Sequence, residues 1–184
     1  MADDRALLTA LGAIQARGAI GEASLAGAIA HAEQFVAALP PSVSTLVDLG
    51  SGGGLPGLVI AVRRPELSIT LVERRHSRAD LLSRAVRALE LGARVTVVAD
   101  DVRRLATHAA GTFDVVTARS FAAPSITAHW AGMLLRVGGV LVVSEPPAES
   151  GETTDGRWPA EVLAAAGLVD LGREQGVRRF RRER

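Results

Sequence analysis

A glycine-rich stretch between positions 47 and 58 constrains the fold of this 184-residue chain more than any other feature. The short apolar and β-branched run at 44–49 suits a buried parallel strand, and Pro56 can occupy the first turn of a helix that extends to about Arg64. Glycines at 50, 52 and 54 allow a ligand to approach the backbone, and the helix N-terminus behind them offers unpaired N–H groups. This order of strand, glycine turn and helix predicts a nucleotide-binding loop.

Acidic residues at two strand ends help to separate the cofactor classes that use such a loop. The segment Gly52–Gly57 satisfies the dinucleotide pattern G-x-G-x-x-G, so NAD is one alternative. Asp48 would repel a pyrophosphate on the helix N-terminus, but it would attract the ammonium and sulfonium groups of S-adenosylmethionine. Glu73 ends the next apolar run, 68–72, where it can accept both ribose hydroxyl protons. The two acids favour S-adenosylmethionine, and a structural glycine turn without a ligand is the remaining alternative.

A turn after the third predicted strand extends this site. The strand is expected at 94–99, and the turn at 100–105 lies where this class of fold places an adenine ring. Asp101 can accept from the exocyclic amine and Val102 can cover the ring face, although a solvated helix N-cap is the alternative for the aspartate. The residues predicted to bind the cofactor are Asp48, Gly50, Ser51, Gly52, Gly54, Leu55, Glu73, Asp101, Val102, Arg103 and Arg119.

The rest of the chain alternates strands with helices. Further strands are expected at 113–118 and 140–144, with a closing hairpin at 168–173 and 177–182. Further helices are expected at 3–17, 22–39, 77–91, 123–136 and 161–166. We therefore expect an α/β, doubly wound Rossmann-like fold of about seven strands, with a C-terminal antiparallel hairpin and an N-terminal helical cap. One domain is expected over 1–184, with the cap at 1–40 and the core at 41–184.

Two segments resemble motifs of a known family. The decapeptide Asp48–Gly57 resembles the glycine motif of the glucose-inhibited division protein B family, and Phe113–Phe121 is similar to its F-D-x-V-x-[SA]-R-[AS]-F. Members are bacterial methyltransferases that transfer a methyl group to a guanine N7 of 16S ribosomal RNA. The resemblance covers roughly Val47 to Glu145. It implies this activity, a class I methyltransferase fold, S-adenosylmethionine as cofactor, and 16S ribosomal RNA or the small ribosomal subunit as partner.

Two positions depart from the family pattern on the expected substrate side. His31 matches the histidine of the family's His-x-x-Asp, but Gln34 replaces the acid. Glu145 stands just after the fifth strand, where the family has the lysine of a Leu-Lys-Gly. These departures leave open a methyltransferase of the same fold that acts on a small molecule. A cofactor-binding protein without activity is the third alternative.

The sequence contains no recognisable catalytic triad, metal-ligand cluster or pair of acids, and its four histidines are scattered. This is consistent with methylation of guanine N7, because N7 carries an unshared electron pair at neutral pH and needs positioning rather than a general base. Arg119, at the end of the fourth strand, is the predicted catalytic residue in an orienting role, through guanine O6 or the cofactor carboxylate. A structural salt bridge is the alternative for Arg119.

Composition and charge set the remaining expectations. The chain is 48% hydrophobic and 22% charged, has no cysteine, and lacks both a long apolar stretch and a secretory N-terminal segment. We expect a cytoplasmic monomer that uses no metal and no membrane. The net charge of +1 provides no overall basic field for RNA. The segment 173–184 holds six arginines against two glutamates, so it either contacts nucleic acid or carries gatekeeping arginines on a solvated edge strand.

Overall fold

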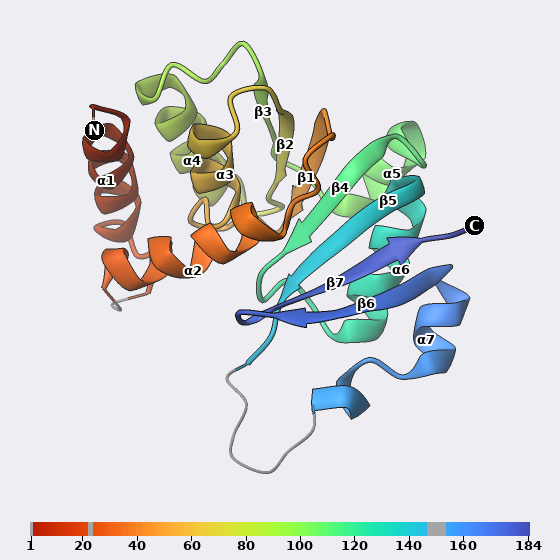
Figure 1. Ribbon diagram of the computed structural model, residues 1–184. Helices are drawn as coiled ribbons and strands as arrows, with labels where there is room; N and C mark the ends of the chain where they lie inside the picture. The colour runs from red at the N-terminus through yellow and green to blue at the C-terminus, as the bar shows by residue number, and fades with distance from the viewer. Residues whose placement is uncertain (1, 22–23, 147–153) are drawn as a thin grey trace.

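The computed structural model describes residues 2–21, 24–146 and 154–184, and the strands in these ranges form one seven-stranded sheet (Figure 1). The strand order is β3-β2-β1-β4-β5-β7-β6, in which β1 to β5 are parallel and β7 pairs antiparallel with both β5 and β6. The strands are β1 (Thr45–Leu49), β2 (Ser68–Val72), β3 (Val95–Val98), β4 (Phe113–Ala118), β5 (Leu135–Ser144), β6 (Leu168–Glu174) and β7 (Val177–Arg182). The strand order reverses between β1 and β4, so the carboxyl ends of these strands flank the crevice where doubly wound folds bind ligands.

Helices cover both faces of this sheet (Figure 1). They are α1 (Ala2–Gln15), α2 (Leu25–Ala38), α3 (Gly57–Arg63), α4 (His76–Ala88), α5 (Val102–Ala109), α6 (Pro124–Leu134) and α7 (Ala160–Ala165), with a short 3-10 helix η1 (Thr154–Arg157). Leu46 of β1 packs in one apolar cluster with α1 to α4, whereas the next residue, Val47, packs in a second cluster with α5 to α7. This alternation buries both faces of β1 and confirms the doubly wound α/β prediction.

The N-terminal helices lie against the first of these faces. Arg63, the last residue of α3, makes an ion pair with Asp4 of α1 at 2.7 Å. The segment between α1 and α2 reaches the glycine loop, because a Cβ at Gly53 would lie 2.3 Å from Ile20 Cγ1. These contacts support our proposal of a single domain over 1–184, whose cap at 1–40 packs on the core at 41–184.

The strands β2, β4 and β7 have the bounds predicted from the sequence, whereas the other predicted elements differ at one end or both. Helix α6 was expected to reach position 136, but it stops before Leu135, which already pairs with Phe113 as the first residue of β5. Helix α5 begins inside the predicted turn at 100–105, where the sequence allowed for a helix only through the N-cap alternative for Asp101. It buries Val102 and Ala106, which lie four residues apart on one helix face. The predicted start of the second helix lies at 22–23, outside the described residues.

Candidate functional site

The glycine loop connects the carboxyl end of β1 to the N-terminus of α3. Gly50 and Gly52 have φ angles of 65° and 52°, in the left-handed region that favours glycine. Ser51 ties the loop to the sheet, because its N–H donates to the carbonyl of Val72 (2.9 Å) and its hydroxyl donates to the carbonyl of Asp48 (2.9 Å). The loop backbone is thereby held at the carboxyl edge of the sheet, where Gly50 borders two adjoining cavities.

Asp48 lies beneath this loop and is 1% exposed. Its Oδ1 accepts a hydrogen bond from Thr117 Oγ1 (2.7 Å), while Oδ2 has no hydrogen-bond partner among the described residues. Burial raises the pKa of Asp48 to about 6, although the hydrogen bond from Thr117 acts in the opposite direction. A buried carboxylate with one unused oxygen is stabilised by a positively charged group, so Asp48 suits a cationic ligand.

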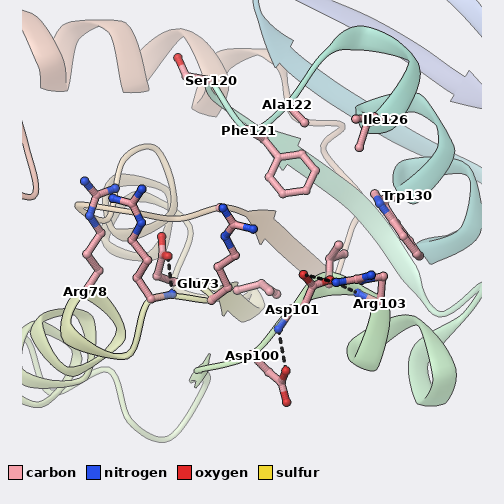
Figure 2. Close-up of a pocket in the computed structure, with 15 residues that line it drawn as sticks. Glu73, Arg78, Asp100, Asp101, Arg103, Ser120, Phe121, Ala122, Ile126 and Trp130 are labelled. Atoms are coloured by element: carbon pink, nitrogen blue, oxygen red, sulfur yellow. Dashed lines mark hydrogen bonds and ion pairs between the residues drawn. The ribbon is translucent and has the colours of Figure 1, made fainter.

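Glu73 follows β2 and is also buried. Its Oε2 accepts a hydrogen bond from the N–H of Gly52 (3.0 Å). Its Oε1 accepts one from the N–H of Arg75 (2.8 Å), which Figure 2 marks as a dashed line. These bonds hold the carboxylate at the border of the first cavity. Each oxygen has a further lone pair, so Glu73 can also accept hydrogen bonds from a ligand.

Asp101 is the N-cap of α5. Its Oδ1 accepts hydrogen bonds from the backbone N–H of Arg103 (2.9 Å) and from Arg103 Nε (3.0 Å), which confirms the N-cap alternative for this aspartate. The hydrogen bonds from the side chain and then the backbone of Arg103 lower the pKa of Asp101. Asp101 and Arg103 lie together on one wall of the first cavity (Figure 2). A contact between Asp101 and an adenine amine stays a prediction.

The first cavity has a volume of about 570 Å³ and lies at the carboxyl ends of β1 to β4. Charged side chains form one wall, whereas Phe121, Ile126 and Trp130 form an apolar wall opposite them (Figure 2). Phe121 points from this wall toward the middle of the cavity (Figure 2). An aromatic wall that faces hydrogen-bonding groups suits a flat ring with a polar edge, such as a nucleobase.

The second cavity, also of about 570 Å³, shares Gly50, Arg78 and Ser120 with the first. Arg119 and Arg157 also line it. Guanidinium groups from α4, from the end of β4 and from η1 therefore border one space. Such a lining suits a polar or anionic ligand.

Arg119 and His31 both line the second cavity, where the charge of Arg119 acts on the imidazole of His31. No ion pair of Arg119 occurs within the described part of the chain, which leaves the structural salt bridge without support. Burial lowers the pKa of Arg119, and the charge of Asp48 opposes this effect. Burial also lowers the pKa of His31, and the charge of Arg119 lowers it further, so the imidazole is neutral near pH 7. The cavity therefore combines a cationic donor with a neutral ring.

The structure explains one of the two departures from the family pattern. The side chain of Glu145 is 0% exposed, and its Oε1 accepts a hydrogen bond from Trp158 Nε1 (2.6 Å). Glu145 therefore does not present its charge at the cavity surface. Gln34 lies beside Gly176, because a Cβ added at Gly176 would be 2.9 Å from Gln34 Oε1. Nothing in the structure explains why a glutamine replaces the family's acid at position 34.

Most of the predicted cofactor residues border the two cavities. The first is lined by Gly50, Glu73, Asp101, Val102 and Arg103, and the second by Gly50, Ser51, Gly52, Leu55 and Arg119. Asp48 lies beneath the loop instead. Gly54 packs toward the core, because a Cβ there would lie 2.4 Å from Leu58 Cδ1.

Several residues that line the cavities were missed from the sequence, among them Ile126, Trp130, Ser120 and Arg157. Ile126 and Trp130 lie four residues apart on one face of α6, and this spacing was a usable signal. Ser120 has a φ of 54°, which its residue type does not indicate. Arg157 reaches the second cavity from η1, and no local pattern marks it.

The arginine-rich C-terminal segment is largely paired within the protein. β7 lies between β5 and β6, so the edge-strand alternative is wrong for its arginines. Its ion pairs are Arg178 with Asp170, Arg179 with Glu174, and Arg181 with Glu183. Arg74, Arg75 and Arg78 line the first cavity, and like Arg119 they make no ion pair with a described residue.

The described ranges contain neither a metal-ligand cluster nor a membrane-spanning helix. No group of three or more histidine or acidic side chains there could hold a metal ion. No helix there is long and apolar enough to cross a membrane.

Comparison with solved structures shows the fold. Cofactor-bound Rv0187 from MTB superimposes with a TM-score of 0.71 at 22% identity, over 98% of this chain and 91% of that one. A putative O-methyltransferase from Klebsiella pneumoniae superimposes with a TM-score of 0.70 at 14% identity, over 97% of this chain and 90% of that one. The chain therefore has the class I methyltransferase fold.

Comparison of sequences shows the family. The family described as rRNA small subunit methyltransferase G matches residues 28–155. Ribosomal RNA small subunit methyltransferase G from Salinispora arenicola is 44% identical over 119 residues, which are 62% of this chain and 49% of the relative. The protein of the same name from Acidiphilium cryptum is 34% identical over 147 residues, 75% of this chain and 65% of the relative. This chain thus spans about half the length of the first relative, and it belongs to the rRNA small subunit methyltransferase G family.

Proposed function

We propose that this protein is an S-adenosylmethionine-dependent methyltransferase that methylates a guanine N7 of 16S ribosomal RNA, free or in the small ribosomal subunit. The observation that carries the proposal is the junction of the two cavities at Gly50, Arg78 and Ser120. A nucleoside cofactor in the first cavity would meet a substrate base in the second at this junction. Membership of the rRNA small subunit methyltransferase G family supports the ribosomal substrate.

The residues present fit S-adenosylmethionine. Glu73 would accept the ribose hydroxyls, and Val102 and Phe121 would cover the two sides of the adenine ring. The unused Oδ2 of Asp48 would balance the positive charge of the methionine end beneath the glycine loop. The left-handed glycine at position 50 lets the ligand approach the backbone. When bound, the cofactor supplies a methyl group on a positively charged sulfur.

The remaining residues act by positioning. Guanine N7 needs no base, so the protein must align the nucleotide and exclude water. Arg119 is proposed to donate to guanine O6 and leave N7 open, because a bidentate contact to both atoms would cover the nucleophile. Its freedom from ion pairs in the described residues leaves its donors available for this contact. The neutral His31 would contact the base or ribose without taking part in proton transfer.

Two exposed arginines are proposed to hold the RNA. Arg74 and Arg75 border the first cavity and are exposed. Phosphate contacts of this kind make binding weaken with salt, by about 0.7 log units per log unit of salt for each phosphate on a single strand. A ribosomal substrate also implies that the protein works in the cytoplasm, and we propose that it does so as a monomer.

A methyltransferase of the same fold that acts on a small molecule is the alternative. In the sequence, Glu145 favours the small-molecule alternative, because an acid in place of a lysine would repel RNA. Its carboxylate is buried and bonded to Trp158, which weakens that argument. The two kinds of substrate also differ in how their binding depends on salt. The affinity for a small uncharged substrate would hardly change with salt concentration.

Methyl transfer tests the proposal directly. Labelled S-adenosylmethionine is incubated with small subunits, or with 16S RNA from a strain without its own N7 methylation, at several salt concentrations. The expected result is label at a guanine N7, with increasing suppression by salt. Calorimetry with S-adenosylmethionine and with NAD provides the cofactor control. Cofactor binding without any label in RNA would favour the small-molecule alternative, and binding of NAD alone would overturn the proposal.

A further inference from the structure

A buried hydrogen-bonded cluster borders the second cavity next to the end of β5. We call Glu145, Arg157 and Trp158 the clasp. The N–H of Glu145 donates to the carbonyl of Gly176 (2.8 Å), and its Oε1 accepts from Trp158 Nε1 (2.6 Å). The Trp158 ring is buried against Phe180, with ring centroids 4.7 Å apart. The carboxylate of Glu145 is therefore fixed on its backbone side and on one oxygen.

Arg157 lies against the other oxygen of this carboxylate. Its Nη1 is 3.7 Å from Glu145 Oε2, and Oε2 has no hydrogen-bond partner among the described residues. A charge-assisted hydrogen bond would be about 2.7–2.9 Å long, so the pair is electrostatic rather than tightly bonded. A guanidinium group carries five N–H donors. Glu145 can thus orient Arg157 without occupying its donors.

The accessible charge of the second cavity is positive. The side chain of Arg157 is 38% exposed, whereas that of Glu145 is 0% exposed. Glu145 supplies the one carboxylate among the described residues that line this cavity. Arg78 and Arg119 line the same space. Three guanidinium groups and a shielded carboxylate favour an anion in this cavity.

We propose that Arg157 binds an RNA phosphate next to the target guanine, and that Glu145 and Trp158 are positioning residues for it. The inference rests on the proposed function and adds a phosphate subsite to it. Arg119, close to Asp48, handles the base at the end of β4. Arg157 enters from η1 and holds the backbone of the same nucleotide. Glu145 therefore contributes to RNA binding through Arg157.

The first test compares Arg157→Ala and Arg157→Lys with Arg87→Ala. Arg87 is exposed on α4 and lines neither cavity, so it serves as the matched control. Methylation of 16S RNA gives kcat and KM at several salt concentrations, and calorimetry gives cofactor affinity. Arg157→Ala should raise KM for RNA about tenfold and reduce the salt slope by about 0.7 to 0.9. Arg157→Lys should keep the slope and lose part of the affinity, because it retains the charge without the bidentate fork.

The second test asks whether Glu145 acts through Arg157. Glu145→Gln keeps an acceptor for Trp158 and removes the charge, so it should raise KM less than Arg157→Ala does. The same change in an Arg157→Ala background should have no further effect, because neighbouring residues of one unit are not additive. Additive effects in the double variant would overturn the positioning role.

Different results would refute the phosphate subsite at Arg157 and the proposed function. An Arg157→Ala variant with wild-type KM and wild-type salt slope overturns the phosphate subsite and leaves the proposed function standing. The subsite is also overturned if this variant loses cofactor affinity in proportion to its rise in KM. A wild-type protein that binds the cofactor but leaves RNA unmethylated overturns both.

Discussion

Replacing Asp48 by asparagine should stabilise the unliganded protein at neutral pH. Asparagine keeps the shape and the hydrogen bond from Thr117, but it removes the buried charge. Burial raises the pKa of Asp48 from 3.8 to about 6, and one pKa unit corresponds to about 1.4 kcal/mol, so the ionised form costs about 3 kcal/mol. The cost is absent below about pH 4, where Asp48 is protonated in both states, and complete above about pH 6. The free energy of unfolding should therefore rise by up to about 3 kcal/mol near pH 7, and much less near pH 4.

The same substitution should weaken cofactor binding. A hydrogen bond to a charged group contributes about 1.5–3 kcal/mol, which corresponds to a rise in Kd of roughly ten- to a hundredfold. In the wild type, affinity for S-adenosylmethionine should increase as the pH rises through about 6, because Asp48 becomes ionised. Asp48→Asn should lose this pH dependence. Urea unfolding and calorimetry between about pH 4 and 8 measure both effects.

Asp114 provides a matched control at the opposite end of the sheet. Its Oδ2 accepts from the N–H groups of Ser44 (2.8 Å) and Thr45 (2.9 Å). Burial raises the pKa of Asp114, but these bonds and one from Arg136 lower it well below its ordinary value. Asp114→Asn should therefore reduce stability at neutral pH and leave cofactor affinity unchanged. The reasoning is refuted if Asp48→Asn binds the cofactor like the wild type and does not stabilise the unliganded protein.

Three further substitutions address the loop, the ribose contact and the RNA surface. Gly50→Val should abolish cofactor binding in calorimetry while circular dichroism still reports a folded protein. The β-carbon of the valine would lie 2.8 Å from the Phe121 ring, at a φ of 65°. Normal cofactor affinity would contradict the open approach of the ligand to position 50. Glu73→Gln loses one acceptor for a backbone N–H, so stability should fall by about 1 kcal/mol and cofactor affinity by about tenfold; a change in stability alone would limit Glu73 to a structural role. Replacing Arg74 and Arg75 by alanine should reduce the salt slope of RNA methylation by about 1.4 to 1.8, and an unchanged slope would place the RNA elsewhere.

The sequence by itself was sufficient for features whose cause is local. The strands at 68–72 and 113–118 have their predicted bounds, because short runs rich in apolar and β-branched residues specify strands buried on both faces. The glycine loop is likewise local, since the left-handed angles at Gly50 and Gly52 require the residue type itself. Most of the predicted cofactor residues follow from the loop and the strand ends, because parallel strands bring their carboxyl ends to one edge.

The tertiary structure decided the features that depend on distant partners. Glu145 reads as an isolated negative charge in the sequence, but its carboxylate is buried, and Trp158, 13 residues away, donates a hydrogen bond to one of its oxygens. The sequence leaves open whether Arg178 contacts RNA or acts as a gatekeeper on an edge strand, but Asp170 on the neighbouring strand makes an ion pair with it. The junction of the two cavities depends in the same way on the convergence of α4 with the ends of β1 and β4. Such pairings leave no periodicity in the chain, because they form only when strands and helices far apart in sequence pack together.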